Sequence, residues 1–139
     1  MSYCQRSDIE DIFGVTNVAQ WADLDNDEKA AKITARIARA IAVADAEVDS
    51  RLRGSPLTVP VVDSAGDTPV LITDVAARLA GVWLYENRGV QDAPEDSNGE
   101  HRLSGHRRRA EKQLAMFRAN PSMCGGVVSR TVAPEVVKE

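Results

Sequence analysis

Three carboxylates near the end of one long helical pattern are the first candidates for chemistry in this sequence. The stretch IARAIAVADAEVDSRL, residues 37–52, carries Asp45, Glu47 and Asp49. Asp45 and Asp49 lie one helical turn apart, so their like charges could raise one pKa and provide an acid/base pair. However, Glu47 and Asp49 each precede an arginine by four residues, which is the favourable order for surface ion pairs. The spacing therefore favours a solvated or inter-subunit face over an active site.

The second candidate is the basic stretch HRLSGHRRRAEK, which contains Arg107, Arg108 and Arg109 in succession. We expect these arginines in the first turn of the last helix, where positive charge opposes the helix dipole and costs stability. Phosphates, or acids of another subunit such as the Asp23–Glu28 loop, would offset that cost. Three alternatives stay open: arginines that fan out into solvent, pairing between subunits, and a small DNA-binding module.

An acidic loop offers a third candidate. Asp23, Asp25 and Asp27 alternate as at the start of a calcium-binding loop, but the sixth position is Glu28 instead of Gly and the twelfth is Thr34 instead of Glu. The calcium interpretation fails on both requirements. We expect instead that Asp27 or a neighbour caps the next helix, whose positive end the other acids favour.

The remaining reactive residues have no partners at useful spacing. His101 and His106 lack a nearby Cys or further ligand, and Cys4 and Cys124 stand near opposite ends of the chain. The sequence contains no nucleophile elbow, glycine-rich phosphate loop or metal signature. We therefore expect no enzymatic activity, no metal and no cofactor.

Composition sets wider limits. The 139 residues suffice for one domain, and 43% hydrophobic with 27% charged residues is normal for a globular protein. A net charge of −4 argues against a chain that mainly coats nucleic acid. The first residues hold acids where a signal peptide needs an apolar run, and no stretch has the length of a membrane span. We expect a soluble protein that is made in the cytoplasm and has no membrane partner.

The candidate residues described above are expected to lie on helices or on the loops between them. Periodicity, caps and breakers predict a short helix that begins with a Ser7–Glu10 capping box, and a second short one around Val18 and Trp21. Three longer helices are predicted at residues 27–52, 69–87 and 104–120, with polar loops at 53–69 and 90–105. The fold class is mostly α: a small bundle of four to five helices with an extended loop or hairpin and an extended C-terminal arm. Residues 1–124 form the helical domain and 125–139 the arm.

The longest predicted helix has two faces that can pack. Its core stripe consists of Ala30, Ile33, Ile37, Ile41, Ala44, Val48 and Leu52. Beside it runs a stripe of small residues, Ala31, Ala35, Ala38, Ala42 and Ala46. A helix with two packable faces can have two partners, so the alanine stripe is predicted to contact another subunit.

The last predicted helix should turn Leu103, His106, Ala110, Leu114 and Phe117 to the core. In the helix before it, one face should carry Leu71, Ile72, Val75, Ala76, Leu79, Val82 and Trp83.

The C-terminal residues alternate valine with polar side chains, as a strand does, but contain Pro134. We expect an extended arm without a partner in its own chain. The predicted interface thus consists of the alanine stripe, Asp49, Arg107, Arg108, Arg109, Val127, Val128, Val132 and Val136.

Four stretches of the sequence resemble a known family in their order. They are SYCQRSDIEDIFG, DLDNDE, VADAEVDSRLRGSPLTVP and VLITDVAARLAGVWLYENR, within roughly residues 2–120. This pattern resembles the Mu-like phage protein family, whose members begin with a Tyr, a capped short helix and Phe-Gly. That family looks like the head-to-tail connector adaptors of tailed phages, which are similar in architecture to HK97-type head completion proteins.

The resemblance implies a small helical bundle without catalytic residues. Such a bundle docks as a homo-oligomeric ring, typically twelvefold, beneath the portal protein in the neck of the virion, and it seats the next stopper or tail component. DNA would pass through the lumen without specific binding. The segment VVDSAGDTPV is longer than the family pattern suggests, and the valine-rich tail after Gly126 also departs from it.

Overall fold

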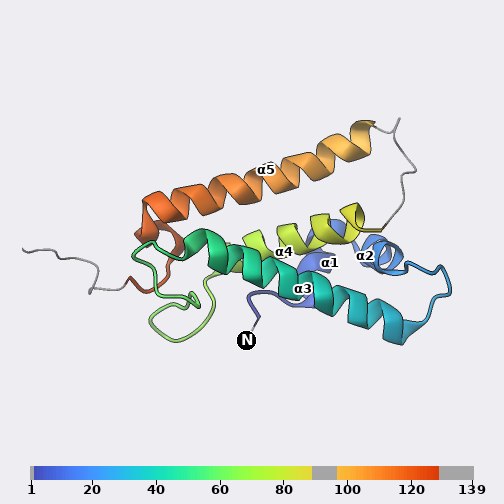
Figure 1. The fold of residues 1–139 in the computed structure, drawn as a ribbon, viewed down its shortest axis with the longest axis horizontal. Coiled ribbons are helices and arrows are strands. Elements are labelled where there is room, and N and C mark those ends of the chain that lie inside the picture. Colours follow the sequence, from blue (N-terminus) through green and yellow to red (C-terminus); the bar gives the residue numbers. More distant parts are fainter. Residues whose placement is uncertain (1, 89–96, 129–139) are drawn as a thin grey trace, which may run out of the picture.

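Three long helices lie side by side, with α4 between α3 and α5 (Figure 1). The computed structural model describes residues 2–88 and 97–128, which form five packed α-helices and no sheet. The elements are α1 (Arg6–Phe13), α2 (Val15–Ala22), α3 (Ala30–Leu52), α4 (Val70–Glu86), α5 (Ser97–Ala119) and the 3-10 helix η1 (Pro121–Cys124). The predicted mostly α bundle of four to five helices is confirmed.

Helix α4 is the centre of the core and contacts α1, α2, α3 and α5. The sequence analysis predicted one apolar face on this helix, but it is buried over most of its circumference. Its buried residues are Ile72, Val75, Ala76, Ala77, Leu79, Ala80, Gly81, Val82 and Leu84. Leu71, predicted on the buried face, is 41% exposed. A helix that is apolar on nearly all sides requires neighbours on nearly all sides, and the other helices supply them.

Helix α1 approaches α4 closely because residue 81 is glycine. A Cβ at Gly81 would overlap the ring of Phe13. That ring makes edge-to-face contacts with Trp21 of α2, at 5.5 Å between centroids, and with His106 of α5, at 4.7 Å. Phe13 therefore joins four helices at one point.

Helix α1 begins slightly earlier than predicted, with a different cap. The backbone N–H of Gln5 donates to Asp8 Oδ2 at 2.7 Å, so the capping pair is Gln5 and Asp8, not Ser7 and Glu10. Glu10 instead pairs with Arg6 Nε at 2.9 Å. The observed pair has the same three-residue spacing and lies two positions earlier in the chain.

Helix α3 begins at Ala30, three residues later than predicted, because the preceding turn needs left-handed backbone. Asn26 and Glu28 have φ angles of 55° and 56°, a conformation that a helix does not contain. Most of the predicted core stripe is confirmed: Ile37, Ala44, Val48 and Leu52 are buried, together with Ala40. Ile33 and Ile41 are partly buried, but Ala30, which was also predicted in the stripe, is exposed.

Helix α5 begins at Ser97, seven residues before the predicted Ser104, so the expected loop at 90–105 is wrong for its described part. The stretch was assigned to a loop because it is polar, yet it contains Glu100, Arg102 and Leu103, which favour helices. The arginines at 107–109 therefore lie in the middle of the helix, where the helix dipole does not destabilise them as it would in the first turn. The predicted core residues Leu103, Ala110, Leu114 and Phe117 are buried.

Candidate interaction surface

The alanine stripe lies on the outer side of α3. The five alanines fall within an arc of about 80° at helical spacing, and Ala31, Ala35, Ala38, Ala42 and Ala46 are all exposed. The opposite side of α3 packs against α4 and α5. The described part of the chain therefore leaves this second packable face uncovered.

Two surface depressions flank the stripe. One, of about 830 Å³, lies between Ile41 of α3, the N-terminal residues 2–8 and the residues that precede α4. The other, of about 350 Å³, lies on the far side of the stripe and is lined by Ala35, Arg36 and Arg39 of α3 and by residues 22–25. The stripe therefore lies between two depressions, and its Ala35 lines the second of them. Depressions beside small side chains allow a protruding element of another molecule to pack closely.

The carboxylates at the end of α3 bind the N-terminal segment instead of forming an acid/base pair. The Tyr3 hydroxyl donates to Asp49 Oδ1, and the Tyr3 backbone N–H donates to Asp45 Oδ1 at 3.0 Å. The Val61 N–H donates to the Tyr3 hydroxyl at 2.9 Å, and the Thr73 hydroxyl donates to the Tyr3 carbonyl at 2.8 Å. Tyr3, which is 5% exposed, connects α3, the 53–69 loop and α4.

These contacts change the expected roles of Asp49 and its neighbours. The predicted Glu47–Arg51 ion pair is confirmed, at 3.5 Å. Asp49, predicted to pair with Arg53 and to lie at an interface, receives the Tyr3 hydroxyl within its own chain. Burial, together with the nearby Asp49 charge, raises the pKa of Asp45. The sequence analysis missed Tyr3, although a tyrosine close to the N-terminus is an apolar anchor with a polar tip.

The thiol of Cys4 is inert at neutral pH. Cys4 is buried and free, and burial, with the Asp45 and Asp8 charges, raises its pKa to about 12. The second cysteine, Cys124, is also buried and free. A thiol that stays protonated is a poor nucleophile and a poor metal ligand.

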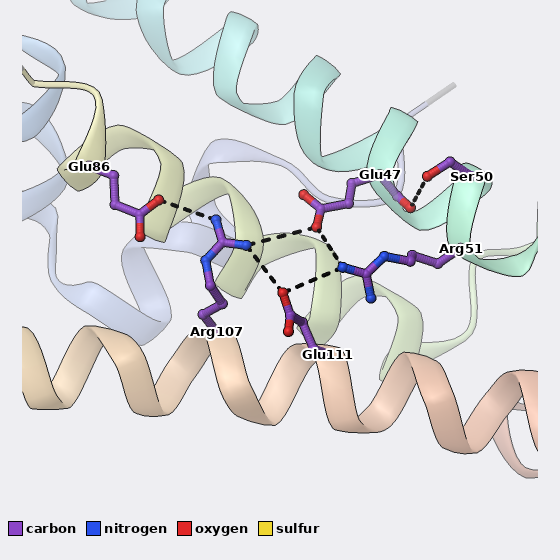
Figure 2. Close-up of polar contacts among 6 residues, drawn as sticks. All are labelled: Glu47, Ser50, Arg51, Glu86, Arg107 and Glu111. Atoms are coloured by element: carbon purple, nitrogen blue, oxygen red, sulfur yellow. Dashed lines mark hydrogen bonds and ion pairs between the residues drawn. The ribbon is translucent and has the colours of Figure 1, made fainter.

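Arg107 belongs to a network of charged side chains that links three helices (Figure 2). Its guanidinium pairs with Glu86 of α4 at 3.2 Å, with Glu111 of α5 at 3.4 Å and with Glu47 of α3 at 3.9 Å. Arg51 of α3 pairs with the same Glu111 at 3.4 Å. Burial lowers the pKa of Arg107, but these carboxylates, Glu86 foremost, outweigh burial and raise it.

The network corrects the expectation for Arg107. This arginine was predicted to meet phosphates or another subunit, but its charge is compensated by acids of its own chain. The sequence analysis could not foresee this because Glu47 and Glu86 are distant in the chain. Arg108 and Arg109, by contrast, are exposed on the outer side of α5.

His106 lies among side chains rather than in a metal site. Its Nδ1 lies 2.6 Å from Arg78 Nη1, and Asp74 in turn accepts from Arg78 Nε at 2.9 Å. Burial and the Arg78 charge lower the pKa of His106. A neutral imidazole that accepts from a guanidinium has a structural role.

The acidic turn between α2 and α3 is built by its own hydrogen bonds. The Asp23 carboxylate accepts from the backbone N–H groups of Asp27 and Glu28, each at 3.2 Å. Lys32 Nζ pairs with Asp25 and Asp27, both at 2.8 Å. Asp27 also accepts from the Lys29 N–H. Lys29 is the N-cap of α3 and the helix has no side-chain cap, so the predicted cap by Asp27 or a neighbour is wrong. The alternating aspartates therefore order the turn through protein donors.

The first residues of the C-terminal arm do have partners in their own chain, which corrects the prediction. The Val127 N–H donates to the Val62 carbonyl at 2.8 Å, and the Thr58 N–H donates to the Val127 carbonyl at 2.9 Å. Val128 forms an isolated antiparallel bridge with Leu57. The expected extended piece at 57–62 supplies these backbone partners. Both valines keep exposed side chains, and Val132 and Val136 lie outside the described residues.

Residues 2–88 and 97–128 contain neither a metal-binding cluster nor a helix that could cross a membrane. Their His, Cys, Asp and Glu side chains nowhere gather in threes close enough to hold a metal ion. No helix there combines the length and the apolar content that a membrane crossing requires.

The sequence was also compared with known proteins. A family model described as "Bacteriophage Mu, Gp36" matches residues 3–123, which include all five described α-helices. No curated protein and no solved structure matches the chain.

Proposed function

Because the chain belongs to the Bacteriophage Mu, Gp36 family, we propose that it is a structural adaptor in the head-to-tail connector of a tailed phage. In this proposal several copies form a closed ring, of about twelve subunits as the sequence resemblance implies, in the neck of the virion. One side of the ring binds the portal protein and the other seats a stopper or tail component. The chain has no enzymatic activity, and DNA passes through the ring without specific binding.

The exposed face of α3 carries the proposal. A subunit in a ring must present two surfaces to its neighbours in addition to its own core. The alanine stripe supports such a role because small side chains let another element approach the helix backbone closely, and the two hollows beside it add relief. In a protein that works alone, a long helix of this kind would normally present charged residues to solvent.

The C-terminal arm supports a second contact. Its root is held by Val62 and Thr58 through backbone hydrogen bonds, so the residues after Val128 start from a fixed point. Their alternating sequence suits addition of a strand to the sheet edge of a partner, where backbone hydrogen bonds provide affinity.

Purified portal protein provides the test. The full chain is mixed with portal, sedimented, and imaged by electron microscopy. The proposal predicts co-sedimentation and a ring of extra density on one end of the portal. Self-assembly without portal is not required, because such a ring can depend on the portal as a template. Absence of any binding to portal would contradict the proposed function.

A further inference from the structure

The outer face of α5 carries an unusual group of cations. Arg108, Arg109 and Lys112 are exposed and lie within one turn of the helix, and within the described residues they form no ion pair. Glu111 lies beside them in sequence but points to Arg107 and Arg51 (Figure 2). Like charges this close repel one another, so the cluster favours an external anion.

Most other arginines of the described body have a partner in the same chain. Arg6, Arg51, Arg78 and Arg107 pair with carboxylates. Others bind carbonyl oxygens: Arg118 those of Arg51 and Arg53, Arg88 that of Gln20, and Arg36 that of Asn87. Arg39 and Arg53 likewise form no ion pair within the described residues, but the cluster on α5 gathers three such cations within about one turn. Gly105, Ala115 and the exposed Met116 share its face. This exposed group of cations is accessible to an acidic surface.

The acidic turn between α2 and α3 is a surface of this protein that complements the basic cluster on α5. The turn Asp23–Glu28 carries four carboxylates, and residues 24–28 are exposed. It is pre-organised by the hydrogen bonds of Asp23 and by Arg88, which binds Asn26 Oδ1 at 3.1 Å. Lys29 and Lys32 neutralise part of the charge, but the turn stays negative. A turn that is already ordered loses little entropy when it binds.

Within one copy the two surfaces cannot meet. The acidic turn lies where α2 leads into α3, away from α5 (Figure 1). The residues of the basic cluster are exposed, on the side of α5 opposite its buried residues. When two complementary surfaces lie on different sides of a subunit, copies associate head to tail. Such an association closes into a ring if the rotation between successive copies permits it.

A second copy explains the cluster better than DNA does. The whole chain has a net charge of −4, whereas domains that bind DNA are usually basic. The α5 cluster offers a phosphate backbone only its three cations, and the acidic turn would repel such a backbone if it came close.

We propose that Arg108, Arg109 and Lys112 of one copy bind the acidic turn Asp23–Glu28 of the next copy. This contact rests on the proposed ring and identifies the pair of surfaces that joins its subunits. Charge complementarity of this kind fixes register and speeds association, and it weakens with salt.

Sedimentation equilibrium of the full chain without portal tests the contact. The wild type is expected to self-associate at low salt and to dissociate as salt is added. Reversal of the α5 charges (Arg108→Glu with Arg109→Glu), or of the turn (Asp25→Arg with Glu28→Arg), should weaken association by roughly tenfold or more. A chain that carries all four changes should recover association to within roughly threefold, because the charges are complementary again. Misfolding would not produce this recovery.

The outcomes separate the two proposals. A wild type that stays monomeric at low salt, reversals that leave association unchanged, or a four-residue variant that does not recover would each overturn the contact. Duplex DNA that binds the wild type and not the α5 reversal, with no self-association, would overturn it in favour of a nucleic acid. In all of these cases binding of the wild type to portal would leave the adaptor function standing. If the wild type self-associates but does not bind portal, the adaptor function is overturned and the contact between copies stands.

Discussion

Tyr3 ties three segments of the chain together through one side chain and its own backbone. Its hydroxyl donates to Asp49 and accepts from the Val61 N–H, while its N–H and carbonyl bind Asp45 and Thr73. The 53–69 loop in turn holds the root of the C-terminal arm, through Val62 and Thr58. The N-terminal segment therefore fixes the place from which the arm departs.

Removal of the Tyr3 hydroxyl should be costly. In Tyr3→Phe the Asp49 carboxylate and the Val61 N–H both lose a partner, so we expect a loss of about 1–3 kcal/mol in the free energy of unfolding. Chemical denaturation provides the measurement. A double-mutant cycle with Asp49→Ala is the control, and a coupling energy above about 0.5 kcal/mol is expected. Additive effects would show that the two side chains do not stabilise each other.

His106 should make stability depend on pH. Burial and Arg78 lower its pKa in the folded protein, so the unfolded chain binds the proton more tightly. The stability that comes from neutral His106 is therefore fully present above the unfolded pKa of about 6.5. It is lost as the pH falls through the folded pKa. Asp45, whose pKa is raised by burial, acts in the opposite direction.

Thermal unfolding at about pH 7.5 and about pH 5.5 should reveal this dependence. The wild type is expected to be less stable at the lower pH, and His106→Asn should reduce the difference. His101→Asn is the matched control because it removes the other histidine of the chain. An undiminished difference in the His106 variant would assign the titration to another group.

At the scale of the elements, the close packing of α1 on α4 depends on Gly81. Gly-to-Ala changes normally stabilise a helix by about 0.5–1 kcal/mol. At Gly81 the added methyl group would overlap the Phe13 ring, which Trp21 and His106 hold in place. We expect Gly81→Ala to destabilise the protein by about 1–3 kcal/mol.

Gly105 of α5 is the matched control, because a Cβ there has no neighbour within 4 Å. Gly105→Ala should stabilise the protein by about 0.5–1 kcal/mol. Denaturant unfolding of both variants gives the comparison. Equal effects at the two positions would mean that the Phe13 contact does not constrain the approach of α1.

The sequence predicted the helices well where periodicity was strong, and less well where long-range contacts decide. The core stripe of α3 follows from the spacing of Ile37, Ala44 and Val48. The start of α5 was missed because polar composition resembles a loop, although a helix with a solvated side can be equally polar. Asp45 and Val61, which bind Tyr3, and Glu47, which pairs with Arg107, lie about forty to sixty residues away in the chain. No local pattern contains that information.

At the scale of the whole molecule, charge is unevenly distributed. Residues 1–28 contain seven acids and one arginine, whereas residues 103–119 contain five basic residues and one acid. This asymmetry would be unfavourable in a symmetric contact between identical surfaces, but it suits a repeated head-to-tail contact. The exposed alanine stripe on α3 gives the same subunit a third surface, which is free to pack against a neighbour in a portal-bound ring.

The most direct test of this account is the occupancy of the portal by a variant with a blocked stripe. Ala42→Arg places a long charged side chain in the middle of the outer face of α3, where the described part of the chain has no contact to disturb. Thr16→Arg, at an exposed position of α2, is the control. Copies bound per portal are counted by co-sedimentation and electron microscopy. The account predicts that both variants fold like the wild type, that Thr16→Arg fills the ring, and that Ala42→Arg does not. A complete ring of Ala42→Arg subunits on the portal would contradict it.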